Sequence, residues 1–172
     1  MQFELTACSR IRCVVIKDLG LLAVGGVMLR DTKRREVSMG TWSHEPFGND
    51  DACDWSYELL DSNDLSPVEA ALDAVLDGDD YLEASTASNA VAAVEVIAKL
   101  LGKGTQTDAY TENVDKWVKE IHITPAPALI QKAKKALTRI LGDNSELKEL
   151  WQESDATEWE ASMKTLQAVV SA

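Results

Sequence analysis

The chain has 172 residues, of which 45% are hydrophobic and 27% charged, a composition typical of a soluble globular protein. This composition excludes an intrinsically disordered chain and a membrane-spanning protein as general classes. The net charge of −12 argues against nucleic acid as a partner, because the phosphates would be repelled. The charge favours a basic protein as partner, and it would equally serve solubility alone.

Residues 1–38 differ from the rest of the chain in charge and in residue pattern. They contain seven basic and four acidic residues, so this part carries +3 and the remaining residues carry −15. The run "IRCVVIKDLGLLAVGGVML" is rich in β-branched residues and has no helical period. We therefore predict a non-helical or poorly ordered N-terminal extension over residues 1–38, outside the native domain, and a helical domain over residues 39–172.

The apolar run from Leu19 to Leu29 is the candidate for a membrane or targeting segment. Its 11 residues are too few to cross a bilayer, which takes about 20. The basic sequence "RDTKRRE" follows it, where a secretory signal would have a small-residue cleavage site. We therefore expect no membrane association and a cytoplasmic location.

The chain contains three cysteines, an odd number that fits a reducing compartment. Cysteine and histidine are common zinc ligands, so a zinc site could be formed by Cys8, Cys13, Cys53 and His44. Their spacing does not match that of zinc-binding motifs, so we predict no metal site here. The sequence implies no cofactor.

Capping residues delimit the first two predicted helices. Asn49 is a favourable N-cap and acidic residues follow it, which predicts a helix over about residues 50–60. In "SPVEAALDAVLDG", Ser66 as N-cap, Pro67 at the first helical position and Gly78 after the end predict the second helix.

A central helix is predicted over residues 79–102, "DDYLEASTASNAVAAVEVIAKLLG". Glu95 is the only charged residue between Ala84 and Ala98, so the helix is apolar on most of its sides. A helix of this kind lies in the middle of a bundle, and we expect Val91 and Val94 to be among its most buried residues.

The C-terminal third predicts further helices. A short amphipathic helix is expected over residues 114–121, a longer one from Thr124-Pro125 to Gly142, a turn of helix at "SELKELW", and a last helix at "DATEWEASMKTLQAVV". Asp155 and Glu158 are expected to form a capping box at the start of the last helix. The fold class that follows is all-α, a single compact bundle of about six to seven helices.

Three segments, "MGTWSHEPFGNDDACDWSYELL", "YLEASTASNAVAAVEVIAKLLG" and "SELKELWQES...EW", resemble the bacterial family known as domain of unknown function 4259. The resemblance runs from about Met39 to the C-terminus, and Met39 resembles the start of the family's own members. Gly48 departs from the acidic residue often found after the phenylalanine. The resemblance implies a small, mostly helical bacterial protein and assigns no catalytic residue.

A strip of carboxylates is predicted on the helix over residues 50–60. Asp51, Asp54 and Glu58 are spaced i, i+3 and i+7, which places them on one side of a helix. They are candidates for a hard-cation site or for contact with the Lys and Arg side chains of a partner. The plainer interpretation is a solvated acidic face.

Glu83 is a second candidate carboxylate. It projects onto the apolar stripe of the predicted central helix, which would bury it partly and raise its pKa, as in general acid–base residues. The alternative is a purely structural role, because "DYLE" from Asp80 to Glu83 has the pattern of a capping box.

Trp42 precedes the predicted helices. It either folds the segment "GTWSHEPFG" onto the bundle or is an exposed aromatic residue that binds a partner.

Two functional hypotheses follow. The first is an immunity-like or regulatory protein whose acidic face binds a basic protein. The alternative is a metal-dependent hydrolase in which Asp51, Asp54, Glu58 and Glu83 surround the metal.

Overall fold

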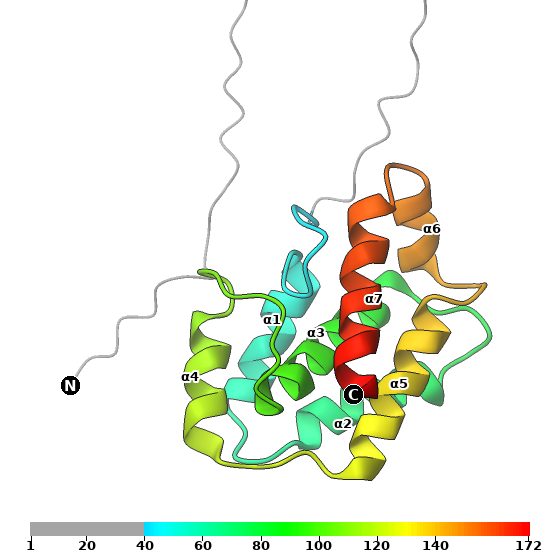
Figure 1. Ribbon diagram of the computed structural model, residues 1–172. Helices are drawn as coiled ribbons and strands as arrows, with labels where there is room; N and C mark the ends of the chain where they lie inside the picture. Colours follow the sequence, from blue (N-terminus) through cyan, green and yellow to red (C-terminus); the bar gives the residue numbers. More distant parts are fainter. Residues whose placement is uncertain (1–39) are drawn as a thin grey trace, which may run out of the picture. The chain divides into compact units, whose positions relative to one another are not determined.

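The computed structural model describes residues 40–172, and this part of the chain is all-α, as predicted (Figure 1). The predicted N-terminal extension over residues 1–38 lies outside the described residues. In chain order, the helices are α1 (Asp50–Leu60), α2 (Ser66–Leu76), α3 (Ala84–Leu100), α4 (Glu112–Ile121), α5 (Pro127–Ile140), α6 (Glu146–Gln152) and α7 (Thr157–Ser171).

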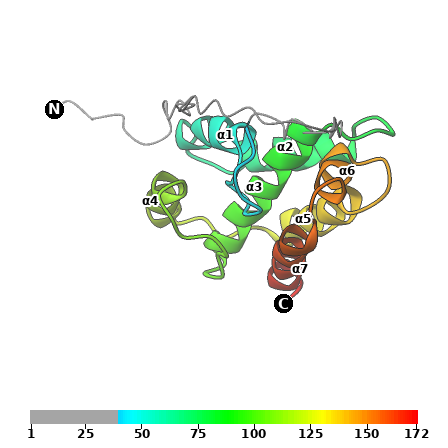
Figure 2. The ribbon, with the colours of Figure 1, turned by 90° about the horizontal axis from the view of Figure 1, so that it is seen from above.

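Helix α3 is the central helix, which confirms the prediction from its apolar composition. It contacts each of the other six helices. In both ribbon views it runs between α4 on one side and α5 and α7 on the other (Figures 1 and 2). Val91 is 4% exposed and Val94 is fully buried, as expected. The core of residues 40–172 is therefore built around this helix.

The predicted start of the central helix at residue 79 is wrong, since α3 begins at Ala84. The preceding residues instead pair with the loop before α6. The N–H of Leu82 donates to the carbonyl of Asn144 at 2.9 Å, and the N–H of Glu146 donates to the carbonyl of Leu82 at 3.0 Å. These hydrogen bonds satisfy the backbone of the segment in an extended form, so the helix does not extend back through it.

The other predicted helices are present, with small changes at their ends. Asn49 caps α1 as predicted, its side-chain oxygen accepting from the N–H of Ala52 at 2.8 Å. Helix α5 begins at Pro127 rather than at Thr124-Pro125. The capping box predicted at Asp155 is wrong: the Asp155 carboxylate accepts from the N–H of Thr157, the first residue of α7.

The segment over residues 40–49 forms a tight loop before α1. The N–H groups of Trp42 and Ser43 both donate to the carbonyl of Gly48, at 2.9 and 3.2 Å. A Cβ atom at Gly48 would lie 2.5 Å from the Ser43 carbonyl oxygen, so this turn requires glycine. Phe47, which is fully buried, anchors the segment on the bundle.

Among the described residues, no helix is both long and apolar enough to cross a bilayer.

Candidate functional site

The predicted carboxylate strip lies on the outer side of α1. Asp51, Asp54 and Glu58 are all exposed, and we call these three residues the acidic face. The ion pairs found in residues 40–172 involve other carboxylates. The acidic face therefore has no ion pair with a cation of the described residues.

The pKa of Asp51 is raised above its ordinary value. Partial burial is the main cause, and the neighbouring charges of Asp50 and Asp54 add to it. Ionised Asp51 is therefore repelled by the neighbouring carboxylates of Asp50 and Asp54.

The prediction for Glu83 is wrong in its placement. Glu83 is exposed and precedes the first turn of α3, so it does not lie on the buried stripe of the helix. The predicted capping box at Asp80 is also absent. Instead, the N–H of Ala84 donates to the carboxylate of Glu146 at 2.8 Å, so a residue of α6 caps the start of α3.

The metal-dependent hydrolase hypothesis lacks a ligand set. No group of three or more His, Cys, Asp or Glu side chains in residues 40–172 is arranged to hold a metal ion. Two open grooves, of about 300 and 400 Å³, are lined by other residues than the acidic face and Glu83. Neither of these grooves therefore brings the predicted carboxylates together.

Of the four residues considered for zinc, Cys53 and His44 lie within the described part of the chain. Cys8 and Cys13 lie outside the described residues. Cys53 is buried, with its sulfur 3.8 Å from the carbonyl oxygen of Phe47. His44 pairs through Nδ1 with the carboxylate of Glu158 on α7, at 3.2 Å.

Trp42 is exposed and is paired with a second aromatic residue. Its ring centroid lies 5.1 Å from that of Tyr110, and the two ring planes are tilted by 37°. Trp42 is 44% exposed and Tyr110 is 41% exposed, so both rings still offer a face to solvent. We call these two residues the aromatic pair. Phe47, and not Trp42, fixes the segment to the core, which leaves Trp42 available for contact.

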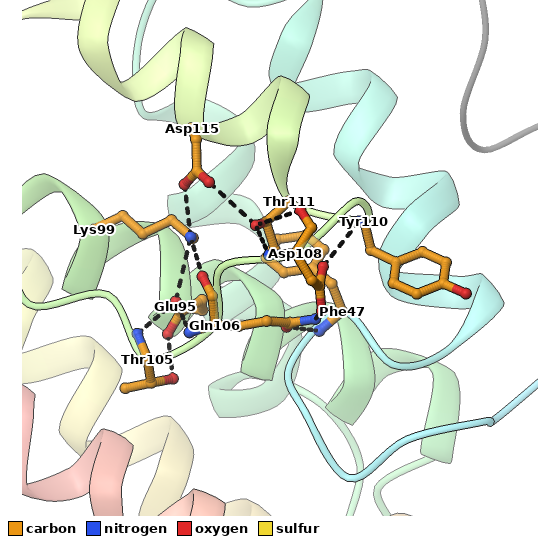
Figure 3. Close-up of polar contacts among 9 residues, drawn as sticks. All are labelled: Phe47, Glu95, Lys99, Thr105, Gln106, Asp108, Tyr110, Thr111 and Asp115. Carbon is orange, nitrogen blue, oxygen red and sulfur yellow. Dashed lines mark hydrogen bonds and ion pairs between the residues drawn. The ribbon is translucent and has the colours of Figure 1, made fainter.

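Gln106, whose role the sequence pattern did not predict, connects the two backbone segments that carry the aromatic pair. Gln106 is 1% exposed, and its side-chain oxygen accepts from the N–H of Phe47 at 2.8 Å. Its side-chain nitrogen donates to Asp108 at 2.8 Å, and Asp108 in turn accepts from the N–H of Tyr110 at 2.8 Å. Figure 3 shows these contacts, with the Tyr110 ring pointing away from them. Gln106 therefore joins the segment that carries Trp42 to the loop that carries Tyr110.

Gln106 is itself fixed to the central helix by Glu95, which is fully buried. The Glu95 carboxylate accepts from the N–H groups of Thr105 and Gln106, at 2.8 and 3.0 Å, and from the Thr105 hydroxyl at 2.7 Å. Burial raises the pKa of Glu95, while these hydrogen bonds and the nearby Lys99 ammonium oppose the rise. The sequence signal that could have indicated this buried polar contact is the single charged residue in the apolar stretch of the helix.

Lys99 extends the same contacts to α4. Its ammonium nitrogen lies 3.6 Å from Glu95 and 2.6 Å from Asp115, and it also donates to the carbonyl of Gln106. The other carboxylate oxygen of Asp115 accepts from the Thr111 hydroxyl at 3.2 Å. Together these residues form the buried network of Figure 3, which fixes the loop between α3 and α4.

Comparison with known proteins gives one family. A family model described as "Domain of unknown function (DUF4259)" matches residues 40–162, which is most of the chain. No curated protein matches, and no solved structure matches.

Proposed function

The chain belongs to the DUF4259 family, which its description leaves without an assigned activity, and we propose that it acts by binding a basic protein. The binding surface consists of the acidic face of α1 and the aromatic pair. The immunity-like or regulatory role of the first hypothesis is the class of function that such a surface serves.

The observation that carries this proposal is the combination of uncompensated charge with exposed aromatic rings on neighbouring parts of the chain. Asp50, the first residue of α1, donates its N–H to the carbonyl of Gly40 at 2.7 Å, so the segment that carries Trp42 is tied directly to the acidic helix. Aromatic residues are enriched at interfaces, and complementary charge speeds encounter with the partner. In this surface the carboxylates supply the association rate and the rings supply affinity.

A cytoplasmic location is part of the proposal. Residues 40–172 have a large apolar core, and a domain with such a core can fold without disulfides. A reducing compartment suits such a protein.

The experiment is affinity capture from the native host with the full chain as bait, followed by association kinetics with the purified partner. We expect the association rate to fall with added salt and to fall for Asp51→Lys/Asp54→Lys/Glu58→Lys. The matched control is Asp143→Lys/Glu149→Lys/Glu153→Lys, which makes the same change of net charge within α6 and on either side of it. An association rate that responds equally to both triple variants would overturn the proposed surface.

A further inference from the structure

We propose that the aromatic pair is the docking point for an arginine side chain of the partner. This inference rests on the proposed function and deepens it, since it names the group of the basic protein that gives the surface its affinity. The acidic face attracts a partner of positive charge. The aromatic pair then favours arginine, because the arginine side chain can also stack on aromatic rings.

The geometry of the two rings is the first support. Their centroids are 5.1 Å apart and their planes are inclined by 37°, so the two rings are in contact and do not form a parallel stack. Each residue is exposed by about two fifths, at 44% and 41%. A planar guanidinium packs against aromatic faces and is less strongly hydrated than an ammonium, so arginine suits these faces better than lysine.

The rigidity of the pair is the second support. An exposed aromatic side chain binds well when little conformational freedom is lost on binding. Here the backbone of each ring's segment is held by Gln106, through Phe47 on one side and through Asp108 on the other. Gln106 is held in turn by Glu95, because the backbone N–H of Gln106 donates to the buried Glu95 carboxylate. The spacing of the rings is therefore set before the partner arrives.

Charge is the third support. Residues 39–172 carry a net charge of −15, and the carboxylates of the acidic face have no cation paired with them among the described residues. The adjoining segment carries the rings, so a cation drawn toward α1 arrives beside an aromatic surface. A neutral apolar partner would gain nothing from this field.

The test measures binding of a hexa-arginine peptide to the full chain by titration calorimetry at low salt. Trp42→Leu and Tyr110→Leu keep an apolar side chain but remove the aromatic face. We expect each to weaken binding about two- to fivefold, the range for a cation on an exposed ring. Tyr81→Leu is the matched control, because Tyr81 is 50% exposed and has carboxylate neighbours in α6, but it lies outside the pair. It should leave the affinity unchanged, and a hexa-citrulline peptide of the same shape should not bind.

The outcomes separate this inference from the proposed function. If Trp42→Leu and Tyr110→Leu bind as tightly as the wild type, while charge reversal of the acidic face weakens binding, the docking point is wrong and the acidic surface stands. If neither kind of change alters binding, both are wrong. Far-UV circular dichroism of each variant confirms that the helices are intact, and Trp42→Phe, which keeps a ring, should restore most of the affinity.

Discussion

The side-chain oxygen of Gln106 accepts a hydrogen bond from the N–H of Phe47 at 2.8 Å, although 59 residues separate them in the sequence. Both residues are buried, so neither polar group can turn to water. This one contact sets the position of the segment with Trp42 relative to the loop with Tyr110.

Replacing Gln106 with leucine should therefore loosen the aromatic pair. The N–H of Phe47 would lose its acceptor, and we expect a loss of about 1–3 kcal/mol in the free energy of unfolding. Denaturant unfolding measures this loss. Near-UV circular dichroism should lose the same band that Trp42→Leu loses, since the two rings would no longer keep their tilt. An unchanged near-UV spectrum in Gln106→Leu would contradict the positioning role.

Replacing Glu95 with alanine should be among the most damaging changes in the domain. The buried N–H of Gln106 would be left without an acceptor, the N–H of Thr105 would lose its hydrogen bond, and Lys99 would lose one of its two carboxylates. We expect the free energy of unfolding to fall by about 3–5 kcal/mol. Glu95→Gln keeps one oxygen for the two N–H groups and should lose clearly less, and both are measured by denaturant unfolding.

The difference in stability between Glu95→Gln and the wild type should depend on pH. Because burial raises the pKa of Glu95 in the folded state, its protonated form favours folding, and this contribution is lost as the pH rises through the folded pKa. Glutamine does not titrate in this range. The stability deficit of Glu95→Gln relative to the wild type should thus be largest in acid and shrink toward neutral pH. A deficit that grows with pH would show that Lys99 and the hydrogen bonds outweigh the burial.

Asp51→Asn should stabilise the domain at neutral pH. The raised pKa of Asp51 means that its ionised form costs stability when folded, and the cost disappears as the pH falls below the ordinary aspartate value. The melting temperature at several pH values is the measurement. Asp64→Asn is the control of opposite sign, because hydrogen bonds to Ser66 lower the pKa of Asp64. Its loss of stability should be present at neutral pH and vanish in acid.

Deleting residues 1–38 should leave the melting temperature nearly unchanged. The prediction follows from the change in charge and pattern at Met39, and the family match begins at residue 40. Thermal unfolding of the shortened and the full chain compares the two. A decrease of more than several degrees would place part of this region in the folded core.

The structural features that could be predicted from the sequence are those that depend on residues close together in the chain. Asn49 caps its own helix three residues away, and the burial of Val94 follows from the apolar period around it. The start of α3 could not be predicted, because its cap is Glu146, 62 residues further on. A helix start that is capped by so distant a residue leaves no local sequence pattern.

The parts of the candidate site divide in the same way. The spacing of Asp51, Asp54 and Glu58 predicted one exposed face, since an α-helix fixes which residues lie together. Gln106 could not be predicted, because it lies in a polar loop and owes its burial to partners elsewhere in the chain. Tyr110 lies in the same loop, so its contact with Trp42 could not be predicted from a local sequence pattern either.

The distance in sequence between Phe47 and Gln106 has a consequence for synthesis on the ribosome. The segment over residues 40–49 emerges before the rest of the helical domain, but its partners Gln106, Tyr110 and Glu158 are translated later. A nascent chain that ends before Tyr110 has its acidic helix and only half of the aromatic pair. The proposed binding surface would therefore be complete only on a chain whose translation is well advanced, and a partner that needs both rings would discriminate against unfinished copies.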